Sequence, residues 1–91
     1  MKLSFLINMG LLQPGENLEF RQTLKRSVHR ACVGQDGSIT LDSGETFQSP
    51  STAAARAAGV RAINGWRAWI VVRTNESLAD VRAIANNRSR E

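Results

Sequence analysis

The chain has 91 residues, of which 42% are hydrophobic and 22% are charged, and its formal net charge is +4. These values are typical of a globular domain and exclude wholesale disorder, and the length allows one small core rather than two lobes around a catalytic cleft. Its apolar stretches are much shorter than the roughly 20 residues of a membrane-spanning helix. We therefore expect a single domain with a functional surface and no membrane partner.

The first predicted element is a short helix over residues 2–9. Leu3 and Leu6 recur at helical spacing, and Gly10 can take the left-handed conformation that often ends a helix. A lysine before an apolar run also resembles the start of a signal peptide, but no A-x-A-like cleavage site follows. Cys32 is the single cysteine and cannot form an internal disulfide. These observations favour a cytoplasmic location.

After the turn QPGE, the hydrophobic pattern changes to the two-residue period of strands. The stretches NLEFR, SVHRACV, SITL and ETF follow this period, with Leu18 and Phe20 pointing inward from the first of them. An Asp-Gly pair in QDGS, between the second and third stretches, is typical of a tight hairpin. We expect an antiparallel meander of three or four strands, in which QTLKRS is a loop that carries Lys25 and Arg26.

A well-marked helix is predicted to begin at Ser49, which can cap it. Pro50 suits the first helical position, a run of alanines favours propagation, and Gly59 suits the position after the end. The alanine-rich surface of this helix allows it to pack close to a sheet. We expect it to cover one face of the meander.

The next prediction is a tight turn at Asn64-Gly65 followed by a strand over residues 66–73, WRAWIVVR, because this run is rich in aromatic and β-branched residues. Two-residue alternation places Trp66 at the head of the buried face. Trp69 lies on the other face among arginines, so it is either a core residue or an exposed platform for a base or sugar. The predicted buried face continues as Ala68, Ile70 and Val72.

Ser77 and Asp80 have the spacing of a capping box at the start of a last helix, whose apolar stripe continues to Ala85. Together these elements predict an α+β fold. We expect a small antiparallel sheet of three to four strands plus one strand from the C-terminal half, with a short N-terminal, a central and a C-terminal helix. Residues 1–86 are expected to form the domain, and residues 87–91 are expected to form a frayed tail.

The charge is unevenly distributed along the chain. Residues 1–50 contain five basic and five acidic residues, whereas residues 51–91 contain seven arginines and three acidic residues. No acidic residue occurs from Thr46 to Asn75. This asymmetry favours an anionic partner, with an ordinary solvated surface as the alternative.

The side chains that catalysis requires are scarce. The chain has one histidine, one cysteine and no close cluster of carboxylates, and His29 has no partner at metal-ligand spacing. No glycine-rich phosphate loop is present in the sequence. We therefore expect no enzyme activity, no cofactor and no metal.

The remaining groups are suited to nucleic acid. Backbone N–H groups and hydroxyls at the start of the central helix can hold a phosphate, although capping alone explains Ser49. Ser51 is the stronger candidate because capping does not require it. Arg67 and Arg73 are expected on one side of a strand, roughly 20 Å apart. The predicted DNA-binding residues are Ser49, Ser51, Thr52, Arg56, Arg61, Asn64, Arg67, Trp69 and Arg73.

Four stretches in this order, LINMGLLQPGENLEF, DGSITLDSGETFQSPSTAA, NGWRAW and SLADVR, resemble the restriction enzyme adenine methylase associated (RAMA) domain over nearly all of residues 3–82. The resemblance implies an α+β module found beside DNA adenine methyltransferases and other restriction-modification components, without a catalytic centre, that binds DNA, including modified DNA. The sequence departs from the family at LKRSVHRAC, where members usually have a shorter, glycine-containing turn.

Two functions follow from these observations. The preferred one is a non-enzymatic DNA-binding module, with double-stranded DNA as its ligand, that reads modified DNA or assists a restriction-modification system. The other is a protein-interaction module that docks its basic face on an acidic surface of a methyltransferase, nuclease or similar partner, aided by pairing along a sheet edge.

Overall fold

The computed structural model describes residues 2–89, which form both helices and strands. The first half contains α1 (Leu3–Asn8), β1 (Asn17–Gln22), the 3-10 turn η1 (Thr23–Lys25), β2 (Ser27–Val33), β3 (Ile39–Leu41) and β4 (Thr46–Phe47). The second half contains α2 (Pro50–Ala58), α3 (Gly65–Ala68), β5 (Ile70–Val71), β6 (Glu76–Ser77) and α4 (Leu78–Ser89). The α+β class is therefore confirmed.

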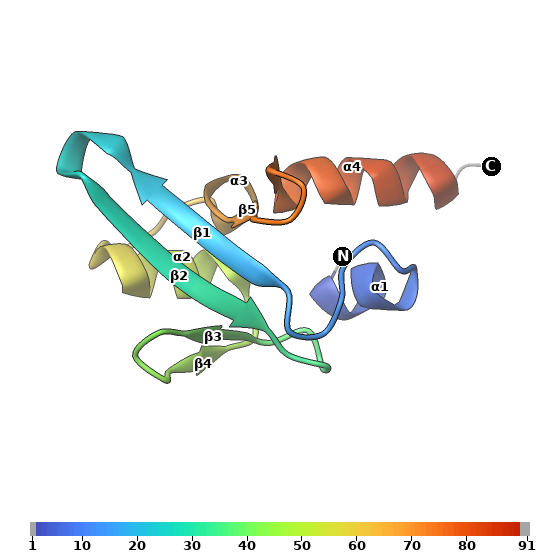
Figure 1. Ribbon diagram of the computed structural model, residues 1–91, viewed down its shortest axis with the longest axis horizontal. Coiled ribbons are helices and arrows are strands. Elements are labelled where there is room, and N and C mark those ends of the chain that lie inside the picture. The colour runs from blue at the N-terminus through green and yellow to red at the C-terminus, as the bar shows by residue number, and fades with distance from the viewer. Residues whose placement is uncertain (1, 90–91) are drawn as a thin grey trace.

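The strands form one antiparallel sheet in the order β4-β3-β2-β1-β5-β6, which contains six strands and is larger than predicted. β1 and β2 pair from Asn17–Cys32 to Gln22–Ser27. The strands on either side contact only part of this hairpin. β5 pairs only with Leu18 and Glu19 of β1, and β3 pairs only with residues 31–33 of β2. The far end of the β1–β2 hairpin therefore extends beyond the sheet (Figure 1). We call its residues 21–28 the arm.

The core lies between one face of the sheet and the helices. Leu18 and Phe20 of β1 are buried, which confirms the predicted alternation. α2 covers the same face through Ala53 and Ala54, whose small side chains allow the helix to approach closely (Figure 1). α1 and α4 complete the core, which also contains Leu3, Leu6, Leu12, Ala31, Val33, Ile39, Leu41, Trp69, Val71, Leu78, Val81 and Ala85.

The strand predicted over residues 66–73 is wrong for most of its length. Residues 65–68 form the helical turn α3, and only Ile70 and Val71 pair with β1. This turn changes the phase of the buried positions, so Trp69 is completely buried while Trp66 is half-buried and Val72 is exposed. Aromatic and β-branched residues favoured a strand locally, but packing of the turn against α2 determines the structure.

Asn64 and Gly65 do not form the predicted tight turn. Asn64 is the residue before α3, and Gly65 is its first residue. A Cβ atom at Gly65 would overlap the backbone carbonyl group of Pro50. Glycine is required here for close contact between α3 and the start of α2, and not for a left-handed backbone conformation.

The predicted capping box of the last helix is confirmed. The N–H of Asp80 donates to the hydroxyl of Ser77 at 3.1 Å, and the N–H of Ser77 donates to the carboxylate of Asp80, also at 3.1 Å. α4 continues to Ser89, and the rest of the tail expected to fray, residues 90–91, lies outside the described residues. Within residues 2–89, no helix has the length and apolar character needed to cross a membrane.

Candidate nucleic-acid interface

The start of α2 forms a joint with α3. The Ser49 hydroxyl accepts a hydrogen bond from the N–H of Thr52 at 3.5 Å, as an N-cap does. The Ser51 hydroxyl accepts from the N–H of Gly65 at 3.0 Å and so fixes α3 against α2. Ser49 and Ser51 therefore both have structural roles at the positions where the sequence suggested a phosphate clamp.

Thr52 and Arg61 remain at the surface next to this joint. Together with Ser51 they line a hollow of about 220 Å³ between α2 and the connection that follows it. Both side chains are exposed, and Arg61 has no ion-pair partner among residues 2–89. The fold thus brings together three of the predicted site residues, Ser51, Thr52 and Arg61. It leaves the Arg61 guanidinium free to bind an anion.

Arg67 lies on α3 and faces a second hollow, of about 430 Å³, that α4 completes. Across this hollow lies Arg82, whose guanidinium carbon is 4.5 Å from the centre of the Trp66 ring. Arg82 was missed by sequence reasoning, because its position beside Arg67 depends on how α4 packs. Asp80 also lines the hollow, but its carboxylate accepts the hydrogen bond from the N–H of Ser77.

Asn64 lies between Arg61 and Arg67 in the chain. Its side chain is exposed and makes no capping hydrogen bond to α3. Its backbone carbonyl instead accepts from the N–H groups of Arg67 and Ala68 at 3.2 and 3.0 Å. We call the set Thr52, Arg61, Asn64, Arg67 and Arg82 the α2–α3 surface.

Arg73, which the sequence analysis predicts to bind DNA, is already paired with a carboxylate. Its guanidinium donates two hydrogen bonds to the Glu16 carboxylate, at 2.9 and 3.2 Å, and Glu16 is only 7% exposed. These hydrogen bonds lower the pKa of Glu16, and the same contacts raise the pKa of Arg73. Since residues 65–68 are helical, Arg67 and Arg73 also do not share a strand.

Arg56 is likewise compensated, by an ion pair of 3.1 Å with Glu45, the residue before β4. Trp69 is not an exposed platform, because none of its surface is accessible. Its indole N–H donates to the carbonyl of Pro50 at 3.0 Å, and its ring contacts Phe20 edge-on. The interpretation of Trp69 as a stacking residue is therefore wrong.

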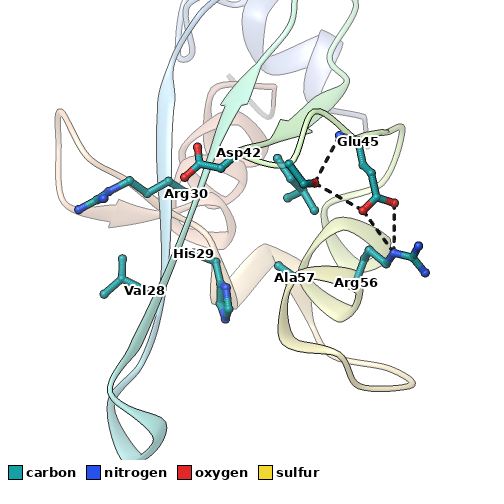
Figure 2. Close-up of a pocket in the computed structure, with 9 residues that line it drawn as sticks. Val28, His29, Arg30, Asp42, Glu45, Arg56 and Ala57 are labelled. Carbon is teal, nitrogen blue, oxygen red and sulfur yellow. Dashed lines mark hydrogen bonds and ion pairs between the residues drawn. The ribbon is translucent and has the colours of Figure 1, made fainter.

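A third hollow, of about 280 Å³, lies between β2 and α2 (Figure 2). His29 points into it from β2, toward Ala57, while Glu45 and Arg56 form its opposite wall (Figure 2). A ring nitrogen of His29 is 2.8 Å from the Gln22 side-chain oxygen. No group of three or more His, Cys, Asp or Glu side chains within residues 2–89 could hold a metal ion.

Comparison with known proteins identifies one family. The family model described as RAMA, Restriction Enzyme Adenine Methylase Associated, matches residues 1–91, which is the whole length of the chain. No curated protein shows a significant match to the sequence.

Proposed function

We propose that this chain, which belongs to the RAMA (Restriction Enzyme Adenine Methylase Associated) family, is a non-enzymatic DNA-binding module. The observation that carries the proposal is that Arg61 and Arg67, which flank Asn64 in the chain, have no ion-pair partner among residues 2–89. They lie in a run of 30 residues, from Thr46 to Asn75, without an acidic side chain. The other two arginines of this run, Arg56 and Arg73, are neutralised by Glu45 and Glu16.

In the proposed complex, Arg61 and Arg67 bind phosphate groups of a DNA duplex. Guanidinium groups pair well with phosphate oxygens, and such contacts fix the orientation of a protein on DNA without reading its sequence. The exposed Thr52 hydroxyl beside Arg61 adds a neutral donor. Arg82 lies against the Trp66 ring and lines the same hollow as Arg67, where these two guanidinium groups outnumber the one carboxylate, that of Asp80.

We assign base recognition to Asn64. An asparagine side chain can bond to both N6 and N7 of adenine in the major groove, and methylation of N6 removes one of the two N6 hydrogens. A module with this contact distinguishes methylated from unmethylated adenine. It would act in the cytoplasm, beside a methyltransferase or nuclease of a restriction-modification system, and would contribute binding rather than chemistry.

The alternative is a protein-interaction module that uses the same arginines on an acidic partner. Pairing along a sheet edge would help such a partner, but the outer strands β4 and β6 have only two residues each. They offer few main-chain groups for pairing. The uncompensated arginines are therefore better explained by a phosphate backbone.

The test is a binding titration, by fluorescence anisotropy, of two duplexes that differ only in N6-methylation of one adenine. We expect both duplexes to bind at low salt with different affinities, and Asn64→Ala to reduce the difference, since a good bidentate base contact gives about 1–3 kcal/mol of discrimination. Absence of binding to either duplex at low salt, with a protein partner that co-purifies, would support the alternative. Equal affinities that Asn64→Ala leaves unchanged would exclude base recognition by Asn64.

A further inference from the structure

We infer that the arm, residues 21–28, is a second DNA contact, which inserts the Leu24 side chain between base pairs from the minor groove while Lys25 and Arg26 hold the adjacent phosphates. This inference rests on the proposed DNA-binding function.

The arm has little contact with the rest of the fold. Beyond the Phe20–His29 pair, β1 and β2 pair only with each other, through Arg21–Val28 and Gln22–Ser27. The η1 turn at the tip is exposed at all three of its residues. Two-stranded ribbons of this kind can bind duplex DNA in the major or the minor groove.

Leu24 is at the end of the arm, and its side chain is fully exposed. A leucine in this position contributes nothing to the core, and water is an unfavourable environment for it. The turn that presents it is fixed by hydrogen bonds, from the Arg26 N–H to the Thr23 carbonyl at 3.1 Å and from the Ser27 hydroxyl to the Lys25 carbonyl at 3.3 Å. Leu24 is thus held outward as an apolar wedge.

The charge around this wedge is positive. From Phe20 to Arg30 the chain has four basic residues and no acidic one. Arg21 and Arg30 both lie within 4 Å of Glu19, but Lys25 and Arg26 have no ion-pair partner among residues 2–89. Proteins that bend DNA from the minor groove combine an apolar wedge with arginine or lysine in the same way. The charges therefore indicate duplex DNA as the occupant.

The arm also lies at the same end of the molecule as the end of α2, from which the α2–α3 connection leaves (Figure 1). In Figure 2 the arm and the loop after α2 extend in the same direction, on opposite sides of the hollow lined by Val28, His29 and Arg56. A single duplex at this end of the molecule can therefore contact both the arm and the loop after α2.

The test uses a duplex with 2-aminopurine, whose fluorescence rises when the base is unstacked, and with a donor and an acceptor dye at its ends to report bending. We expect the wild type to increase both signals. Leu24→Ser should remove both increases and lower affinity about tenfold, which corresponds to about 1.4 kcal/mol. The Lys25→Ala/Arg26→Ala double variant should flatten the slope of log affinity against log salt by about 1.8, since each lost phosphate contact accounts for about 0.9.

The matched control is Val28→Ser, which removes another exposed apolar side chain of the arm away from its tip. We expect its signals to equal those of the wild type, and the melting temperatures of all variants to be unchanged because these side chains are exposed. If the wild type binds through Arg61 but Leu24→Ser retains both signals, only the inference about the arm is wrong. If the wild type binds anionic lipid vesicles and not DNA, both the arm inference and the proposed function are wrong.

Discussion

The indole N–H of Trp69 donates a hydrogen bond of 3.0 Å to the backbone carbonyl of Pro50, the first residue of α2. This bond connects the segment before β5 to the start of α2 in the interior of the domain. Phe20 packs against the same ring, with 5.8 Å between ring centres and an interplanar angle of 71°. Trp69 therefore joins the central strand of the sheet to the joint that supports the α2–α3 surface.

The two tryptophans should differ sharply in their contribution to stability. Trp69→Ala removes a fully buried side chain and should cost about 3–5 kcal/mol of unfolding free energy. Trp69→Phe keeps much of the packing but loses the hydrogen bond to the Pro50 carbonyl, for a cost of about 0.5–1.5 kcal/mol. Trp66→Ala should cost clearly less than Trp69→Ala, because Trp66 is only half-buried. Urea unfolding of the three variants measures these values, and an equal cost for both alanine variants would contradict the assignment.

The joint between α2 and α3 should not tolerate a side chain at Gly65. Gly65→Ala places a methyl group into the Pro50 carbonyl, and overpacking of this kind typically costs about 1–3 kcal/mol. Asn64→Ala is the matched control, because it changes the adjacent exposed residue, whose side chain makes no capping bond. Thermal unfolding should show a lower melting temperature for Gly65→Ala alone. A Gly65→Ala protein as stable as the wild type would mean that α3 does not contact α2 closely.

The Glu16–Arg73 pair should make stability dependent on acid pH. Hydrogen bonds from Arg73 hold the pKa of Glu16 below its ordinary value of 4.5, so between the two pKa values the unfolded state binds more protons than the folded state. The stabilisation is therefore complete above pH 4.5 and is lost as the pH falls through the lower, folded-state pKa. Glu16→Gln lacks this titration.

Urea unfolding of the wild type and Glu16→Gln at pH 7 and at progressively lower pH should show that the stability difference between them decreases below pH 4.5. Asp36, whose pKa is also lowered, by its hydrogen bonds from Ser38, titrates in both proteins and cancels from the difference. A difference that stays constant across this range would show that the pair contributes nothing through ionisation.

Much of the fold could be predicted because local signals agreed with the tertiary structure. The alternation of Leu18 and Phe20 matches a sheet with one covered face, and Ser77 and Asp80 form the cap that their spacing indicates. The phase of residues 66–73 could not be predicted. It depends on the contact between Gly65 and Pro50, and nothing in the local sequence distinguishes a glycine required for close packing from one required for a turn.

The candidate site was predicted less well than the fold. Whether an arginine is free to bind a ligand depends on whether a carboxylate that is distant in the chain pairs with it. Arg73 is neutralised by Glu16, which lies 57 positions earlier, and Arg56 is neutralised by Glu45. Arg82 joins Arg67 only because α4 packs beside α3. The acid-free run identified the correct region, but composition alone could not separate Arg61 and Arg67 from their paired neighbours.

The central claim is that Arg61 and Arg67 bind DNA phosphates, and the most direct test is the salt dependence of duplex affinity for the wild type, Arg61→Ala and Arg67→Ala. Each variant should flatten the slope of log affinity against log salt by about 0.9 and keep the wild-type melting temperature. Arg88→Ala removes the same charge from the exposed end of α4 and should leave the slope unchanged. Slopes for Arg61→Ala and Arg67→Ala equal to that of the wild type would contradict the claim.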